Sequence, residues 1–309
     1  MKISAKNRII SWSVVSLVLI AVLVAGAVCI NSFNLNWNNR LSLFGLQFSF
    51  IDRDDYNDGS SSVAAAQVSD INIDWDAGEV NIEYGKNDKI IFSESNADNS
   101  DKMCWKLTDG KLNIASNKRG FQLFNFGSPN KTLTVTIPEN KKFDELSVAT
   151  ASADIKSTKL SAAELNVSTV SGDVSIEEIK ADDVDISGVS GNITADCEVS
   201  GEIEVESISG DTRISGSYAK GNFSCVSGIT EAEVANKTDS VTFESVSGNI
   251  DIKLSKNADG FQLKRESVSG SFYTKLQGAM DGDTYVYGNG STKIKAETVS
   301  GNISINKAE

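Results

Sequence analysis

The side chains in this sequence best suited to chemistry form a row of acids and amides that recurs along its second half. The row contains Asp154, Asp173, Asn192, Asp211, Asn249 and Asn302. Oxygen ligands a few ångströms apart suit Ca²⁺, so Asp154, Asp173, Asn192 and Asp211 are the candidate cation ligands. The same residue types also complete turns and stack as amides. Because the Gly-Gly-x-Gly-x-Asp nonapeptide of calcium β-rolls is missing, we favour the turn chemistry and predict no metal site.

The composition excludes several classes of enzyme. The chain has no histidine, which rules out Ser-His-Asp and Cys-His catalysis and any His-based metal site. Its four cysteines form no Cys-x-x-Cys pair, so neither a zinc site nor a disulfide framework is expected. A β-helical lyase for acidic polysaccharides needs acids and bases along a groove, yet only Arg213 and Arg265 are arginines after residue 120. We predict no catalytic residue and no cofactor.

A repeat with a period near nineteen residues must position the row. Its pattern is φ-x-φ-x-x-Val-Ser-Gly-Asp/Asn-φ-x-φ, where φ is apolar. The copies begin at Ala151, Val170, Val189, Ile208, Val226, Val246, Val268 and Val299. Self-similarity at this spacing indicates a solenoid, in which each coil buries its apolar face against its neighbours. We therefore predict an all-β, right-handed β-solenoid, or β-helix-like repeat.

Each coil should hold two short strands, since apolar residues alternate with polar ones on both sides of the triplet. In the copy at Val170, the alternation changes phase across Ser168 and Thr169, which predicts a two-residue polar corner there. Val170, Gly172 and Val174 then face the interior. The structural residues of the repeat are the Ser-Gly pairs Ser171, Gly172, Ser190, Gly191, Ser209, Gly210, Ser247, Gly248, Ser300 and Gly301. The serines should satisfy turn backbone groups.

The N-terminal fifth of the chain divides into a basic start, an apolar run and a polar connection. Residues 1–8 carry three cations, and residues 9–30 carry no charge over a length that spans a membrane as one helix. We expect a cytoplasmic N-terminus at 1–8, a transmembrane helix at 9–30, a juxtamembrane segment and tether at 31–67, and an extracellular solenoid at 68–309. A cleaved signal peptide is the alternative.

The charge of the expected ectodomain limits its partners. The whole chain carries −13, and residues 31–309 carry 26 basic and 42 acidic side chains, or −16. Nucleic acid is therefore excluded as a partner, since its binding needs a basic footprint.

The sequence resembles the bacterial putative-adhesin family, a domain of unknown function built of β-strand repeats. The matching elements are the segments 73–82, 133–138 and 151–155 and the Val-Ser-Gly-Asp/Asn copies, and the resemblance covers about residues 68–309. It implies a cell-surface solenoid, often tethered by one membrane helix, with no catalytic residues to carry over. Some members occur with envelope-stress systems.

The function predicted is a non-enzymatic, membrane-anchored surface for an unknown surface protein or glycan, adhesin-like or accessory to envelope sensing. The alternative is a carbohydrate-active enzyme of the β-helix type. An enzyme needs convergent acids in a cleft, whereas a binding module shows a smooth ladder face.

Overall fold

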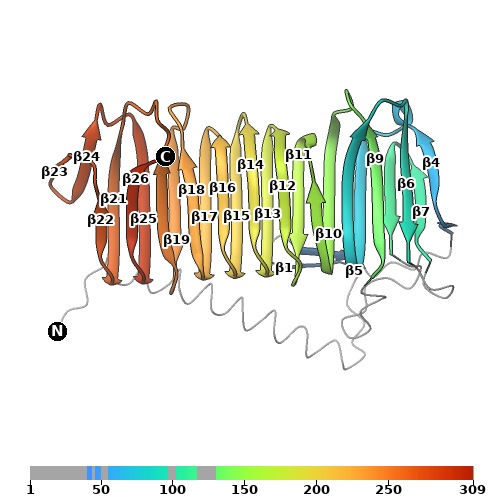
Figure 1. The fold of residues 1–309 in the computed structure, drawn as a ribbon, viewed down its shortest axis with the longest axis horizontal. Helices are drawn as coiled ribbons and strands as arrows, with labels where there is room; N and C mark the ends of the chain where they lie inside the picture. Colours follow the sequence, from blue (N-terminus) through green and yellow to red (C-terminus); the bar gives the residue numbers. More distant parts are fainter. Residues whose placement is uncertain (1–39, 44–45, 50–54, 97–101, 117–129, 309) are drawn as a thin grey trace.

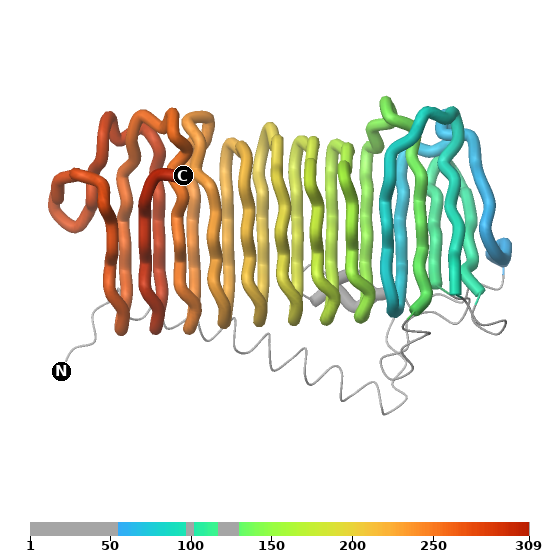
Figure 2. Tube along the Cα trace, viewed as in Figure 1, coloured from blue at the N-terminus to red at the C-terminus, as the bar shows by residue number. Residues whose placement is uncertain are grey.

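The computed structural model describes residues 40–43, 46–49, 55–96, 102–116 and 130–308. Coils stack side by side into an elongated body, with the N-terminal coils at one end and the C-terminal coils at the other (Figures 1 and 2). Twenty-four strands share one continuous hydrogen-bonded sheet. The helical structure in the described residues is one short 3-10 turn, Ala65–Gln67. The predicted all-β, solenoid-like architecture is confirmed.

Two strand faces enclose the core, and we call them face 1 and face 2. Face 1 is formed by the strand that comes before the Val-Ser-Gly corner in the sequence of each coil. Its parallel strands are β8 (Lys111–Ala115), the first halves of β5 (Asp70–Gly85) and β10 (Phe143–Ser157), β11 (Leu160–Thr169), β13 (Asp183–Ser190), β15 (Glu202–Ser209), β17 (Lys220–Ser227), β19 (Ser240–Ser245), β25 (Thr292–Ser300) and β21 (Gly260–Ser269).

Face 2 follows the corner and runs opposite face 1. Its parallel strands are β9 (Thr132–Pro138), the second halves of β5 and β10, β12 (Val174–Ala181), β14 (Ile193–Val199), β16 (Thr212–Ser217), β18 (Ile229–Val234), β20 (Asn249–Leu254), β26 (Ile303–Lys307) and β22 (Phe272–Thr274).

The core is a set of apolar columns that run along the body. In face 1, Leu146 pairs with Leu165, Leu165 with Val184, and Val184 with Ile203, and all four are buried. The next position is Gly221, where an added Cβ would lie 2.8 Å from the rings of Tyr218 and Phe223. An aromatic ring therefore fills the space that a branched side chain occupies in the neighbouring coils.

The corner lies two residues later than predicted. Thr169 is 1% exposed and faces the interior, whereas Val170 is half-buried outside the core and Ser171 is exposed. Gly172 and Val174 are buried, so the phase changes across Val170 and Ser171. The expectation that Val170 packs inside the coil is wrong, because a small hydroxyl residue fits the tight inner corner and a valine does not.

Glycine follows the corner because adjacent backbones approach closely there. A Cβ on Gly191 would lie 2.3 Å from the carbonyl oxygen of Gly172, and one on Gly210 would lie 2.1 Å from that of Gly191. Gly191 and Gly210 also have φ values of 122°. Both the contact and the backbone conformation exclude a side chain.

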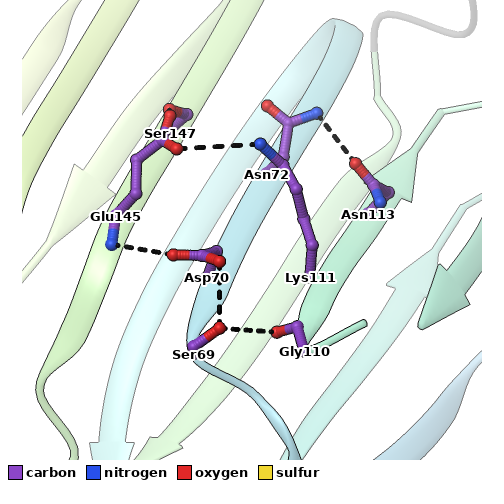
Figure 3. Close-up of polar contacts among 8 residues, drawn as sticks. All are labelled: Ser69, Asp70, Asn72, Gly110, Lys111, Asn113, Glu145 and Ser147. Atoms are coloured by element: carbon purple, nitrogen blue, oxygen red, sulfur yellow. Dashed lines mark hydrogen bonds and ion pairs between the residues drawn. The ribbon is translucent and has the colours of Figure 1, made fainter. Parts of the chain in front are cut away.

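The coils at the N-terminal end are not stacked in chain order. β5 lies between β10 on one side and β8 and β9 on the other. In Figure 3, the hydroxyl of Ser69 donates to the Gly110 carbonyl at 3.3 Å, and the N–H of Glu145 donates to Asp70 Oδ1 at 3.2 Å. The antiparallel strands β6 (Lys89–Ser95) and β7 (Cys104–Thr108) cover this end, followed by β4 (Ser61–Ala64) and β3 (Asn57–Asp58).

The C-terminal end shows the same intercalation. β25 pairs with β19 on one side and with β21 on the other, and β26 lies likewise between β20 and β22. The coil that is last in the sequence is therefore second to last in space. The antiparallel strands β24 (Thr284–Gly288) and β23 (Ala279–Asp281) follow β21.

The sheet begins earlier in the sequence than expected. Residues 57–58 and 61–64, assigned to a flexible tether, pair as β3 and β4 with β7 and β6 and cover the N-terminal end. A short hairpin, β1 (Arg40–Leu43) and β2 (Leu46–Ser49), lies before them. In the described part of the chain, no helix has the length and hydropathy to cross a membrane. The predicted segment 9–30 lies outside the described residues.

Candidate functional site

The predicted row of acids and amides is assembled as a ladder along one edge of the solenoid. Oδ1 of Asp154 accepts the backbone N–H of Asp173 at 2.9 Å, and Oδ1 of Asp173 accepts that of Asn192 at 2.7 Å. Oδ1 of Asn192 then accepts the N–H of Asp211 at 3.0 Å, and Oδ1 of Asp211 accepts that of Ile229 at 3.0 Å. Each rung ties a coil to its neighbour through a backbone donor.

The ladder continues in spatial order rather than in chain order. Oδ1 of Asn249 accepts the N–H of Asn302 at 2.9 Å, and Oδ1 of Asn302 accepts the N–H of Ser271 at 3.0 Å. Ile229 interrupts the row where the repeat has no Asp or Asn. Carboxylate and amide therefore serve interchangeably, because the position requires an acceptor oxygen and not a charge.

The second carboxylate oxygen of one aspartate in the row has a cationic partner. Oδ2 of Asp211 receives Arg213 Nη2 at 3.1 Å on the exposed surface. Among the residues described by the structure, no three His, Cys, Asp or Glu side chains are arranged to hold a metal ion. Calcium binding by the row stays a hypothesis that thermal melts with Ca²⁺ and with chelator can test.

A second column, missed by the sequence reasoning, lies just inside the corner. Thr150, Thr169, Gly188, Ser207, Cys225, Ser245, Thr298 and Ser267 are aligned there by the strand register. Thr169 Oγ1 accepts the N–H of Gly172 at 2.8 Å, and Ser245 Oγ accepts that of Gly248 at 2.8 Å. These hydroxyls close the corner. Their signal in the sequence was the small residue immediately before each Val-like position.

The outward serines of the repeat make a weaker contribution. Ser171 is exposed, and its hydroxyl donates to the Ala151 carbonyl at 3.3 Å. The backbone N–H groups of Ser190, Ser247 and Ser300 bond to carbonyls in the adjacent coil at 2.8–2.9 Å. At these outward serines, the backbone N–H carries the contact between coils.

Three carboxyl groups meet on the outward side of face 1. Asp185 in β13 pairs in register with Glu204 in β15, and Glu206 lies two residues further along β15. Burial, and then the nearby charge of Glu204, raises the pKa of Asp185 to about 6. Burial, followed by the charges of Glu204 and Asp185, also raises the pKa of Glu206. Asp185 and Glu206 therefore hold their protons more tightly than isolated carboxyls do.

Cys104, Cys197 and Cys225 are buried, and Cys197 and Cys225 are free thiols. Burial, and to a lesser extent Asp196, raises the pKa of Cys197 to about 12, and burial also raises the pKa of Cys225. Since the thiolate is the nucleophilic form, these positions are unsuited to covalent catalysis. Their place in the columns of the core makes them packing residues.

The chain belongs to the Toastrack DUF4097 family, whose model matches residues 68–306. This match confirms the predicted family of adhesin-like β-strand repeats with unknown function. No curated protein is significantly similar to the chain.

Several solved structures are similar over most of the chain. They include a putative cell adhesion protein from Clostridium sporogenes (17% identity, TM-score 0.30, 82% of this chain and 100% of that one). A putative adhesin from Bacteroides fragilis has 12% identity and a TM-score of 0.43, and covers 82% of this chain and 97% of its own. A putative lipid binding protein from Parabacteroides distasonis has 16% identity, a TM-score of 0.45 and the same coverage.

Proposed function

We propose that the chain is a non-enzymatic, membrane-anchored, right-handed β-solenoid that presents its outer faces to a protein or glycan outside the cytoplasm. The observation that carries this proposal is a linear row of outward polar side chains on face 1. Asn166, Asp185, Glu204 and Asn222 are partners in register on four successive strands; Glu204 is exposed and the other three are half-buried. A rigid row of donors and acceptors suits an extended ligand.

The rigidity of this row comes from the register. Each side chain belongs to a strand bonded on both sides, so ligand binding does not have to order a loop. The turns that join successive coils in the middle of the body are short (Figure 2). Membership of the adhesin-like family supports the same class of function.

Capture of a partner from membrane and wall extracts tests this proposal. The charge reversal Glu204→Lys, in the middle of the row, should weaken capture. The matched control is Glu177→Lys, which makes the same change at an exposed position of β12 on face 2. Equal capture by wild type and both variants would show that the row is not part of the binding surface.

Membrane anchoring through residues 9–30 is the second part of the proposal. It rests on the uncharged run and on the cations that precede it. Protease added to intact cells, with wall access controlled, should remove the solenoid and leave a short membrane-bound fragment. Full protection of the solenoid would contradict the proposed orientation, and release of an intact solenoid without protease would favour a cleaved signal peptide.

The alternative is a carbohydrate-active enzyme that uses the carboxyls of face 1. The raised pKa of Asp185 favours it, because a general acid must hold its proton near neutral pH. However, Asp185, Glu204 and Glu206 lie on one side of one face instead of flanking a cleft. Sugar release from acidic polysaccharides that is lost in Asp185→Asn would establish the enzyme and overturn the binding proposal.

A further inference from the structure

The last coil in space is capped over only half of its length. β21 pairs with β25 from Phe261 to Ser269, but on its other side β24 pairs only with Gly260–Lys264. β22 pairs with β26 alone among the described strands. From Arg265 to Thr274 the coil therefore presents an unpaired strand edge, which can add a further strand. We call this stretch the open edge.

The open edge combines apolar surface with a cation. Val268 is 67% exposed and Tyr273 is 56% exposed. In the next coil inwards, the counterpart of Val268 is the half-buried Val299 and that of Tyr273 is the polar Ser304. Arg265 pairs in register with the buried Ala296, so its Cα occupies an interior position. Its guanidinium lies 4.6 Å from the centre of the Phe272 ring, across the end of the core.

The charge of this edge differs from that of the whole protein. The open edge itself holds one cation, Arg265, and one acid, Glu266, and it is flanked by Lys264 and Lys275, in a chain of net charge −13. Among the described residues, no carboxylate lies within ion-pair distance of the Arg265 guanidinium. Arg265 lies at the end of the apolar core without a carboxylate partner in the part of the chain that the structure describes. A chain segment that covers this end would therefore be favoured if it carried an anionic group.

We propose that the open edge is a docking site for an extended, acidic segment of a partner protein, which adds as one further coil. A carboxylate of the segment faces Arg265, and its apolar residues cover Phe272 and Val268. This inference rests on the proposed binding function and places the protein partner at the end of the solenoid. β-strand addition provides backbone hydrogen bonds, while Arg265 provides the preference for acid.

A second copy of this chain fits the edge less well. Pairing two open edges across a twofold axis would bring the cations of one copy towards the same cations of the other. Such like-charge contact opposes association. An inward-pointing charge at a strand edge is also a recognised obstacle to edge-to-edge pairing of identical sheets.

The probe is a peptide with the sequence of residues 296–307, which already pairs with this coil from its inner side. Three versions carry Glu, Ala or Lys at the first position, which corresponds to Arg265 in the register. Binding to the full chain in detergent is measured by fluorescence anisotropy. We expect the Glu peptide to bind roughly fivefold more tightly than the Lys peptide, as for exposed charge pairs, and the difference to shrink as salt is raised.

Charge reversal at the site provides the decisive comparison. In Arg265→Glu the order of the peptide affinities should reverse. Lys220→Glu, which also replaces a cation by an acid but lies on β17, should keep the wild-type order. Equal affinities for the three peptides, no binding, or no effect of Arg265→Glu would overturn the proposal. A dimer of the full chain that Arg265→Glu abolishes would assign the edge to a second copy and overturn it as well.

The same variant separates this inference from the broader function. If extracts yield the same partner with wild type and with Arg265→Glu, the binding function stands and the docking site at the open edge is refuted. If the Glu peptide binds as expected but extracts yield no partner, the edge is supported and the broader function is not.

Discussion

The backbone N–H of Asn192 donates to Oδ1 of Asp173 at 2.7 Å, across the gap between two coils. The side-chain Oδ1 of Asn192 in turn accepts the backbone N–H of Asp211 in the next coil, at 3.0 Å. Because an Asn and an Asp perform the same task in neighbouring coils, the acceptor oxygen is the property that stabilises the stack. The negative charge of Asp173 is not required for this contact between coils.

Asp173→Asn should therefore change the free energy of unfolding little, within about 0.5 kcal/mol as for most surface substitutions. Asp173→Ala removes the acceptor and should cost about 1 kcal/mol, the usual net value of one hydrogen bond. Thermal melts of the two variants measure the difference.

Thermal melts of wild type and the two Asp173 variants, with Ca²⁺ and with chelator, test whether the row also binds a cation. If the ladder is purely structural, Ca²⁺ and chelator give the same melting temperature in wild type and in both variants. A Ca²⁺-dependent rise that Asp173→Asn abolishes would show that the charge matters and that the row binds cation.

Two valines of one coil, on either side of the corner, should differ in how much an acidic substitution lowers the free energy of unfolding. Val174 is 1% exposed, whereas Val170 is half-buried outside the core. Val174→Asp buries an unpaired carboxylate and should cost several kcal/mol. Val170→Asp should cost clearly less, since its carboxylate can reach water. Chemical denaturation of both variants measures this, and equal losses would place Val170 in the core.

The repeat made the coil predictable because it is set by local alternation. Leu165, Val167, Val174 and Ile176 are buried as their parity requires. The exact corner was not predictable from hydrophobicity, since Val170 is apolar but lies outside. The inner position instead selects for size and a hydroxyl, as in Thr169, and simple apolar patterning does not register that preference.

The ends could not be read in the same way. Intercalation of β25 between β19 and β21 depends on contacts between residues far apart in sequence. Its one sequence signal was the long step of 31 residues before the Val299 copy. The cap strand β4 was hidden because Ser61–Ala64 is small and polar, and a strand at an edge needs only one apolar side chain, Val63, facing inwards.

The acidic group on face 1 predicts a specific pH dependence. The pKa of Asp185 is raised from 3.8 to about 6 in the folded chain. The folded state therefore binds more protons than the unfolded state between about pH 4 and pH 6, and this contribution to stability is lost as pH rises through that window. Asp185→Asn, which cannot ionise, should raise the melting temperature at pH 7 and leave it nearly unchanged at pH 3.5.

The control is Glu177→Gln, which removes one negative charge from the exposed side of face 2. It should shift the melting temperature less than Asp185→Asn at pH 7. A pH profile that is the same in Asp185→Asn and wild type would mean that Asp185 titrates normally in the folded chain.

Close backbone approach at the corner predicts that two glycines with positive φ respond differently to alanine. Gly282 has φ 63° in the β23–β24 turn, and a Cβ there meets nothing within 4 Å. Gly282→Ala should cost only the backbone strain, about 1 kcal/mol. Gly191→Ala adds a Cβ placed 2.3 Å from the Gly172 carbonyl oxygen, so the coils must separate and the ladder bond from Asn192 to Asp173 must stretch. Its loss of stability should be at least twice that of Gly282→Ala in denaturant melts. Similar losses would show that φ, and not the approach of the neighbouring coil, fixes glycine in the repeat.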